Sequence, residues 1–306
     1  MISVVIPLYN KESHIAETIH SALSQTFKNF ELIIVNDGST DHSADVVKAM
    51  TDPRIKLITI ENSGVSVARN TGIEAAKNKW VALLDADDWW ATTFLEKMVN
   101  AMEAHPQHKI FVSGRSRVFQ KTVERYQHQL LPPDQQTAAV NYFEIISKHL
   151  PPIHSSSVMV DKSIFETTGY FKEGQKKHED HDLWMRLAVG HEVVMVNKNL
   201  SFYRKTEENT ASRASFSATD FCDFLSTMIG VKEKLTLAEQ GFFKKYYNRY
   251  ALLVYFQYYG RYSKKEHELV FEKISTLLNG TALMLARTIK ILPLKGCYRW
   301  LKKIKG

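Results

Sequence analysis

The chain has 306 residues, of which 44% are hydrophobic and 24% charged, a composition typical of a globular protein with one large domain or two modest ones. Its formal net charge is +7, but residues 287–306 hold seven basic side chains and no acid, so the remainder is formally neutral. A broad nucleic-acid-binding surface is therefore not expected, and no apolar run approaches the roughly 18 residues that cross a bilayer.

The first hundred residues alternate between short β-branched runs and longer segments in which apolar residues have helical spacing. We expect strands at 2–8, 30–35, 55–60 and 80–84, and helices at 12–23, 41–50, 65–76 and about 92–104. Strands that alternate with helices of this length predict βαβ units on a parallel sheet.

The alternation weakens after residue 104. We expect strands at 110–118, 155–160, 193–196 and 201–204, helices at 141–149 and 177–190, and a polar loop at 121–137. From about residue 216 the sequence has helical spacing and many Phe and Tyr residues. The chain is therefore predicted to consist of an α/β domain over residues 1–212 and a helical region over residues 213–306.

Polar clusters follow each of the first four predicted strands. They are Tyr9-Asn10, Asp37-Gly38-Ser39, Asn62-Ser63-Gly64 and Asp85-Ala86-Asp87-Asp88. In a parallel sheet, ligands bind beyond the carboxyl ends of the strands, where these clusters are expected to meet. The carboxylates of the last cluster suit a divalent cation or the phosphates that it bridges. Taken alone, that cluster is also compatible with a solvated loop or an acidic helix start.

A second acidic pair, Glu179-Asp180, begins the predicted helix 177–190. One interpretation is that the helix dipole stabilises both acids, and the other is that one of them is a general base. Two common nucleotide-binding motifs are missing from the sequence. No G-x-G-x-x-G follows the first strand, and no phosphate-binding P-loop signature occurs.

Five motifs occur in an order that resembles family 2 glycosyltransferases. They are Pro7-Leu8-Tyr9-Asn10, Asn36-Asp37-Gly38-Ser39-Thr40-Asp41, Ala68-Arg69-Asn70-x-Gly72, Asp85-Ala86-Asp87-Asp88-x-Trp90 and Glu179-Asp180-x-Asp182-Leu183-Trp184. The resemblance covers about residues 1–212. It implies an inverting enzyme of the GT-A fold, which is a Rossmann-like, mostly parallel nucleotide-binding sheet, here with a C-terminal helical region.

The resemblance assigns a nucleotide-sugar site. Pro7 and Tyr9 match residues that border the nucleobase, Asp37 matches an acid that binds the base, and Asp85 matches one that contacts the ribose. Asn62 and Arg69 fall where the family contacts the base and the diphosphate. Uridine diphosphate is the nucleotide that family habit favours.

The resemblance also assigns the chemistry. Asp87 matches the ligand of a divalent metal, Mn²⁺ or Mg²⁺, and Asp180 matches the catalytic base, with Glu179 near the donor or acceptor sugar. Asp88 is expected to support the loop. The family often has a metal-ligating His where this chain has Thr206. Metal binding would then be weaker, or would need a ligand from a neighbour such as His154 or His178.

The function that the resemblance implies is transfer of a sugar, of hexosyl type, from a nucleoside diphosphate to an acceptor hydroxyl. The acceptor would be a saccharide or a lipid-linked saccharide of cell-surface polysaccharide or glycolipid assembly. A nucleotidyltransferase is an alternative, although the sequence has no glycine-rich basic loop after its first strand. A catalytically silent sugar-nucleotide-binding protein is another, suggested by Thr206.

The tail, residues 281–306, has apolar residues at helical spacing and basic residues on the other side. It is equally compatible with binding to an anionic membrane surface and with an ordinary packed helix. No signal peptide is expected, and Cys222 and Cys297 suit free thiols in a reducing compartment. The predicted location is cytoplasmic, with peripheral attachment at the inner face of the cell membrane as an extension.

Overall fold

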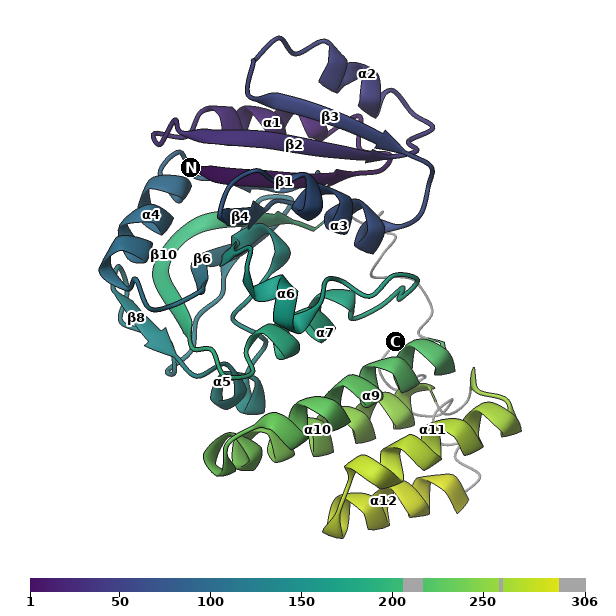
Figure 1. Cartoon of the computed structure of the whole chain (residues 1–306). Helices are drawn as coiled ribbons and strands as arrows, with labels where there is room; N and C mark the ends of the chain where they lie inside the picture. Colours follow the sequence, from purple (N-terminus) through teal and green to yellow (C-terminus); the bar gives the residue numbers. More distant parts are fainter. Residues whose placement is uncertain (206–216, 259–260, 292–306) are drawn as a thin grey trace.

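The computed structural model describes residues 1–205, 217–258 and 261–291 (Figure 1). The strands are β1 (Ile2–Leu8), β2 (Phe30–Asp37), β3 (Ile55–Ile60), β4 (Trp80–Leu83), β5 (Trp89–Trp90), β6 (Ile110–Phe119), β7 (Thr122–Arg125), β8 (Thr137–Val140), β9 (Val158–Asp161) and β10 (Val193–Arg204). The helices are α1 (Ile15–Leu23), α2 (Ser43–Lys48), α3 (Val65–Ala75), α4 (Phe94–Ala104), α5 (Tyr142–Lys148), α6 (Ile164–Thr168), α7 (Glu179–Leu187), α9 (Ala218–Lys234), α10 (Leu237–Tyr258), α11 (Lys264–Leu277) and α12 (Gly280–Ile291), with a 3₁₀ turn at Ser155–Ser157.

All of the described strands join one sheet in the order β3-β2-β1-β4-β9-β6-β10-β5, with β7 on β6 and β8 on β10. The first four strands of this order, β3, β2, β1 and β4, are parallel, and Val4 of β1 lies between Leu32 of β2 and Ala82 of β4. Beyond β4 the sheet is mixed, because β9 runs antiparallel to both β4 and β6. The α/β class and the helical C-terminal region are confirmed, and the parallel order is confined largely to the first half.

Three local expectations differ from the structure. The strand expected at 155–160 is a 3₁₀ turn at Ser155–Ser157 followed by β9. The expected loop at 121–137 contains strand β7, which forms a hairpin with the end of β6. Its side chains are largely exposed, so it lacks the buried alternation that marks a strand in a sequence. The short strands expected at 193–196 and 201–204 are one strand, β10, whose pairing with β6 shifts register between Val196 and Ser201.

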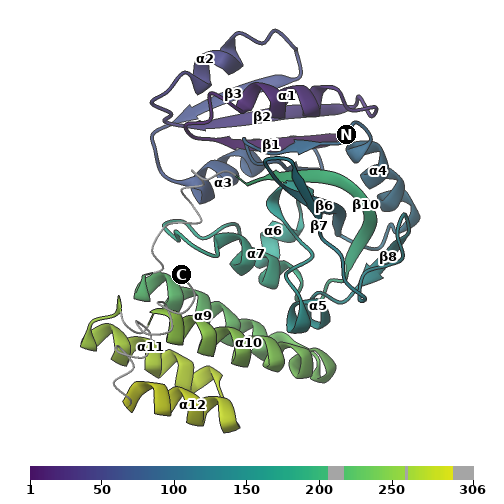
Figure 2. The same ribbon diagram turned by 180° about the vertical axis from the view of Figure 1, so that it is seen from behind.

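Helices cover both faces of the sheet (Figures 1 and 2), and alternating side chains of the sheet enter two apolar cores, one on each face. From β1, Val4 and Ile6 enter the core that α1, α2 and α4 cover, whereas Val5 enters the core under α3, α5, α6 and α7. The result is a three-layer arrangement in which the carboxyl ends of β1, β2 and β4 remain open at one edge.

Helix α3 lies unusually close to the sheet. A Cβ atom at Gly72 would lie 2.3 Å from Cγ1 of Val5, so only glycine permits this approach. The close packing places the preceding turn of α3, with Arg69, against the carboxyl end of β1 and β4.

Helices α9 to α12 form a layer next to α5 and α7 (Figures 1 and 2). They share the core of the neighbouring sheet face, and the ring centroids of Phe143 and Phe243 are 5.4 Å apart. The predicted boundary at residues 212 and 213, and residues 292–306 of the tail, lie outside the described residues. The two-part division and the amphipathic character of the tail therefore stay predictions.

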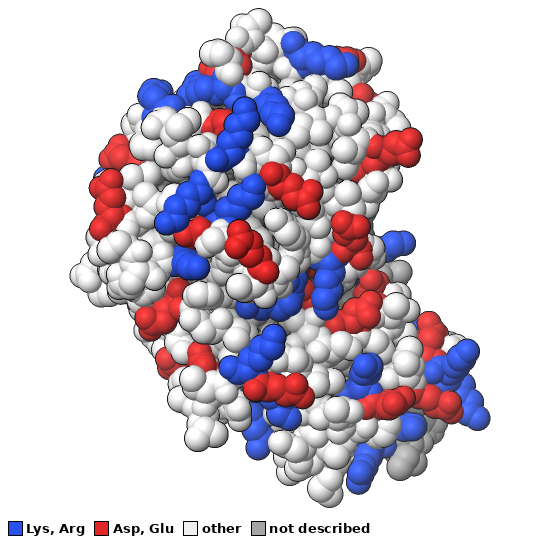
Figure 3. Space-filling model, in the orientation of Figure 1, with Lys and Arg blue, Asp and Glu red and all other residues white. Residues whose placement is uncertain are grey.

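Charge is mixed on the face shown in Figure 3, where basic and acidic side chains are interspersed over both the sheet domain and the C-terminal helices. Within residues 1–205, 217–258 and 261–291, no helix has the length and hydropathy that a bilayer-spanning segment requires. Cys222 is a buried free thiol, and Cys297 lies outside the described residues.

Candidate active site

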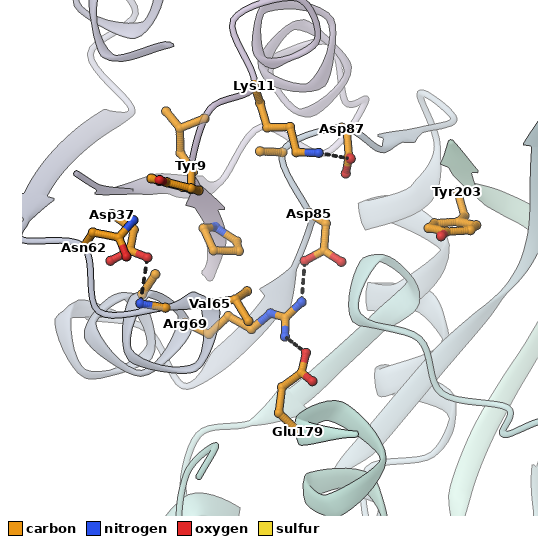
Figure 4. Close-up of a pocket in the computed structure, with 15 residues that line it drawn as sticks. Tyr9, Lys11, Asp37, Asn62, Val65, Arg69, Asp85, Asp87, Glu179 and Tyr203 are labelled. Carbon is orange, nitrogen blue, oxygen red and sulfur yellow. Dashed lines mark hydrogen bonds and ion pairs between the residues drawn. The ribbon is translucent and has the colours of Figure 1, made fainter. Parts of the chain in front are cut away.

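The carboxyl ends of β1, β2 and β4 and the start of α3 surround a cavity of about 380 Å³, within the size range of small-molecule sites (Figure 4). Eight of the nine predicted site residues line it: Pro7, Tyr9, Asp37, Asn62, Arg69, Asp85, Asp87 and Glu179. The ninth, Asp180, follows Glu179 on α7 but is not part of the lining. Residues from all four strand-end clusters therefore meet at one cavity, as expected.

The end of β1 forms one wall. Tyr9 is 46% exposed, so its ring offers a flat apolar surface to an incoming ligand. The next residue, Asn10, has a left-handed backbone with φ of 50°. Its side chain accepts a 2.8 Å hydrogen bond from the backbone N–H of Thr40, which ties this turn to the loop after β2.

Asp37 fixes the loop that carries Asn62. Its two carboxylate oxygens accept hydrogen bonds from the backbone N–H groups of Ser63, at 2.7 Å, and Gly64, at 2.9 Å. Gly38 has φ of 66°, and a Cβ there would lie 2.8 Å from the backbone nitrogen of Asn62. The Asp-Gly pair therefore allows two loops to meet at the cavity wall.

Asp88 holds the acidic loop, residues 85–88 after β4, from the side of the protein interior. Its carboxylate accepts hydrogen bonds from Ser156 Oγ and, at 3.0 Å, from the backbone N–H of Arg204. Thr18 Oγ1 lies 3.0 Å from the carbonyl oxygen of Ala86 and 2.8 Å from that of Asp88. Burial, reinforced by the charges of Asp85 and Asp87, raises the pKa of Asp88 well above its usual range. Asp88 therefore faces the protein interior.

Arg69 connects two parts of the site. Its guanidinium donates to Asp85 Oδ1 at 2.8 Å and to Glu179 Oε1 at 3.3 Å, and its side chain is 5% exposed (Figure 4). It also lies over the ring of Phe171, with Cζ 5.1 Å from the centroid. Burial lowers the pKa of Arg69, but the charges of Asp85 and Glu179 outweigh it and the net shift is upward. Arg69 is a permanent cation.

The remaining positions of the Ala68-Arg69-Asn70-x-Gly72 motif support Arg69. Asn70 exchanges two hydrogen bonds with the backbone of Phe171, one at 2.9 Å and one at 3.0 Å. These bonds hold the segment before α7 against α3. The motif therefore contributes a cavity wall, a buried cation, a backbone clamp and a close helix–sheet contact.

The paired acids at the start of α7 have different environments. Burial, together with the charge of Asp180, raises the pKa of Glu179 to about 7 despite Arg69. Burial also opposes ionisation of Asp180, but His181, Arg69 and a 2.7 Å hydrogen bond from the His181 N–H outweigh it and lower the pKa of Asp180. At neutral pH Asp180 is ionised, as a proton acceptor must be.

The C-terminal helices support these acids through His178. This residue begins α7 with a left-handed φ of 60°, and its Nε2 lies 2.6 Å from the hydroxyl of Tyr250 on α10. Its ring stacks on Phe224 with centroids 5.0 Å apart. Burial, and then the neighbouring His181, lowers the pKa of His178 to about 3, so the ring is neutral.

The histidines expected to replace the missing metal ligand do not reach the cavity. Neither His154 nor His178 is part of its lining. Nδ1 of His154 accepts a 3.2 Å hydrogen bond from the Ser156 N–H, and His178 is committed to Tyr250. A local contact at a 3₁₀ turn therefore holds His154, and a contact with α10 holds His178, so the structure does not place either ring as the missing ligand. Thr206 lies outside the described residues.

Two further polar residues line the cavity that were not assigned a role from the sequence. Lys11 Nζ lies 2.6 Å from Asp87 Oδ2, and the ring of Tyr203 lies on the Asp87 side of the cavity, away from Tyr9 (Figure 4). Lys11 directly follows the Tyr9-Asn10 cluster, and Tyr203 lies three residues before Thr206. Position beside a motif was the available signal for both.

The fit of the site to a hard cation was tested on its oxygen donors. Among the described residues, no three His, Cys, Asp or Glu side chains are grouped as a complete metal cage. Asp88 faces inward, whereas Asp85 and Asp87 both line the cavity, Asp85 beside Arg69 and Asp87 beside Lys11. One carboxylate combined with substrate phosphates is the usual way in which Mg²⁺ is bound, so the residues fit such an ion.

Comparison with known proteins decides the family. The model of the glycosyl transferase family 2 matches residues 3–169, more than half of the chain. The chain belongs to glycosyl transferase family 2. This membership agrees with the motif resemblance and decides against the nucleotidyltransferase alternative.

Relatives and solved structures extend the match. The chain is 31% identical over 208 residues to the UDP-Glc:alpha-D-GlcNAc-diphosphoundecaprenol beta-1,3-glucosyltransferase WfaP of Escherichia coli, covering 67% of this chain and 77% of WfaP. It is 29% identical over 209 residues to an uncharacterized glycosyltransferase of Rickettsia prowazekii, covering 65% of this chain and 64% of that relative's length.

The crystal structure of S. aureus TarS 1-349 in complex with UDP-GlcNAc superposes with a TM-score of 0.76 at 20% identity. The superposition covers 99% of this chain and 91% of TarS 1-349. This likeness confirms the fold, including the helical C-terminal region. The roles of the individual site residues stay predictions.

Proposed function

We propose that this family 2 member is an inverting glycosyltransferase that moves a sugar from a nucleoside diphosphate, UDP in the first instance, to an acceptor hydroxyl. The observation that carries the proposal is the buried bridge Asp85–Arg69–Glu179, which joins the nucleotide side of the cavity to the helix that begins with Glu179-Asp180. The printed names of WfaP, a UDP-Glc glucosyltransferase, and of the UDP-GlcNAc complex of TarS also favour a UDP-sugar donor.

In this proposal the nucleoside occupies the side of the cavity formed by β1 and β2. Tyr9, next to Pro7, borders the base, Asp37 and Asn62 bind its edge, and Asp85 accepts from the ribose hydroxyls. The fixed positive charge of Arg69 faces the diphosphate or the donor sugar. A guanidinium suits this role because it is already charged and held by two carboxylates before the ligand arrives.

Asp87 would hold Mn²⁺ or Mg²⁺ together with the donor diphosphate, and the ion would neutralise the charge that develops on the leaving group. Asp180, ionised at neutral pH, accepts the proton of the acceptor hydroxyl. Attack from the face opposite the leaving diphosphate inverts the anomeric centre. Glu179 stays with Arg69 beside the reacting sugar.

The proposed acceptor is a saccharide or lipid-linked saccharide at the cytoplasmic face of the cell membrane, with peripheral attachment through residues 281–306. The basic residues of the tail support this part of the proposal, at roughly 1 kcal/mol for each basic residue near an anionic surface. Flotation with phosphatidylglycerol vesicles, comparing the full chain with a variant carrying Glu at Lys302, Lys303 and Lys305, tests it. Identical partitioning would remove the membrane role.

The donor assignment is tested by thermal shift with a panel of nucleotide sugars and Mn²⁺, followed by calorimetry on the best donor. Asp87→Ala is expected to abolish the Mn²⁺ dependence of donor binding, whereas the exposed control Asp45→Ala is expected to keep it. Unchanged metal-dependent affinity in Asp87→Ala would refute the ligand assignment. A donor that binds but is never transferred would favour the silent binding protein.

A further inference from the structure

The side chain of Asp87, the proposed metal ligand, already holds a cation of the protein. Lys11 Nζ lies 2.6 Å from its Oδ2, a short charge-assisted contact, and the two side chains are 30% and 15% exposed (Figure 4). The pair spans the cavity wall, because Lys11 comes from the turn after β1 and Asp87 from the loop after β4.

The backbone of Lys11 is anchored on both sides. Its N–H donates to Ser43 Oγ at 2.7 Å, and its carbonyl oxygen accepts from the N–H groups of His14 and Ile15, each at 2.9 Å. These contacts begin α1 and bind it to the start of α2. Any movement of the ammonium group must therefore come from rotations of its four-carbon side chain, which can reposition Nζ without unfolding the turn.

The position of Lys11 means that its ammonium group competes with a metal ion for the carboxylate of Asp87. A divalent ion that coordinates Asp87 Oδ2 needs the same lone pairs and repels the ammonium group, so the two cations cannot both hold this oxygen at contact distance. Once displaced, the ammonium is left beside the place where a metal-bound diphosphate would lie. A diphosphate offers it several anionic oxygens, each a strong acceptor of a charge-assisted hydrogen bond.

We propose that the ammonium group of Lys11 pairs with the carboxylate of Asp87 in the ligand-free enzyme, and that it moves to the donor diphosphate when the donor and its metal ion bind. The inference rests on the proposed function, because it names a further diphosphate-binding residue of the same site. Metal and donor binding are thereby coupled. Lys11 weakens binding of the metal ion alone and strengthens binding of the diphosphate, so the metal ion and the donor bind together.

Two effects of opposite sign follow from replacing Lys11 by Gln, which keeps a similar length without the charge. Mn²⁺ alone should bind about five- to tenfold more tightly, because no internal cation has to leave Asp87. UDP in the absence of metal should bind about five- to tenfold more weakly, because the diphosphate loses its ammonium partner. A residue that merely stabilised the fold would weaken both.

The experiment uses the full chain and two probes. Free Mn²⁺ is titrated by electron paramagnetic resonance without nucleotide, and UDP binding is measured by calorimetry in EDTA. Lys11→Gln is compared with Lys11→Arg, which keeps a cation, and with Lys56→Gln, which removes an exposed lysine on β3. Circular dichroism confirms that each variant is folded.

Tighter Mn²⁺ binding together with weaker metal-free UDP binding in Lys11→Gln, and neither change in Lys56→Gln, is the expected result. Equal Mn²⁺ affinity in wild type and Lys11→Gln, or no binding by either, overturns the competition. Equal metal-free UDP affinity overturns the transfer to the diphosphate. These failures differ from failure of the proposed function, in which Asp87→Ala would keep metal-dependent donor binding.

Discussion

Arg69 and Glu179 are 110 residues apart in the chain and form an ion pair of 3.3 Å that joins α3 to α7. The same guanidinium holds Asp85 at 2.8 Å, so one buried cation spans the distance between the acidic loop after β4 and the helix that carries Asp180 (Figure 4). Together with the hydrogen bonds between Asn70 and Phe171, this side chain therefore sets the relative position of the proposed donor side and base side of the site.

Replacing Arg69 by Met should be strongly destabilising, because it leaves two half-buried carboxylates without their partner. Loss of one member of a buried ion pair costs about 3–5 kcal/mol. The control is Arg117→Met, which breaks the exposed pair with Glu124 and should cost about 0–1 kcal/mol. Urea unfolding at pH 7.5 measures both, and equally small losses would show that the Arg69 bridge is not structurally required.

The pH dependence of stability should report Glu179. Its pKa of about 7 in the folded chain lies above the ordinary 4.5, so the folded state holds an extra proton between those pH values. Stability contributed by this group is full below about pH 4.5 and is lost as pH rises through 7, by on the order of 1–3 kcal/mol.

Unfolding of wild type and Glu179→Gln at pH 5 and pH 8 tests this sign. The variant cannot ionise, so its stability relative to wild type should rise from pH 5 to pH 8. A relative stability that is flat or falls over this interval would contradict the assigned environment of Glu179.

Asp88 should tolerate Asn better than Ala. The raised pKa of Asp88 favours the neutral acid, and Asn is likewise neutral. Asn also retains an oxygen for the Arg204 N–H and a partner for Ser156 Oγ. Ala removes both of these hydrogen bonds, at about 1–3 kcal/mol, and should weaken donor binding by loosening the loop under Asp87. Thermal unfolding and donor calorimetry on both variants are the measurements. Equal behaviour of Asn and Ala would mean that Asp88 does not organise the loop.

The hydroxyl of Tyr250 should matter for turnover more than for donor binding. Tyr250→Phe removes the hydrogen bond to His178, the residue that begins α7 just before Glu179-Asp180. A kcat several-fold lower, with donor affinity within about twofold of wild type, is expected. Tyr247→Phe on the same helix is the matched control. An unchanged kcat would show that α10 does not position the catalytic helix.

The sequence was sufficient to predict features that depend on local pattern. The β-branched runs gave β1 to β4, and the polar residues after them gave five residues that do meet in one cavity, Tyr9, Asp37, Asn62, Asp85 and Asp87. These predictions worked because parallel strands place their carboxyl ends on one edge whatever their exact pairing. Pro7, Arg69 and Glu179 came from the family resemblance and not from the local pattern.

Features that depend on distant contacts were not predictable in this way. Thr18 and Ser156 support the acidic loop through contacts across 68 to 71 residues, and neither belongs to a recognisable motif. The Lys11–Asp87 pair joins two loops 76 residues apart, and the sequence showed only that each lay near a strand end. The antiparallel pairing of β9 with β4 and β6 likewise depends on the whole sheet and not on the residues next to β9 in the sequence.

The central claim is that Asp180 is the base of a UDP-sugar-dependent transfer, and Asp180→Asn tests it most directly. With the donor found by thermal shift, calorimetry gives the donor affinity and a UDP-release assay gives the turnover. The account predicts donor affinity within about twofold of wild type and turnover lower by about 10²–10⁴, the contribution of a general base. Undiminished UDP release from Asp180→Asn would contradict it.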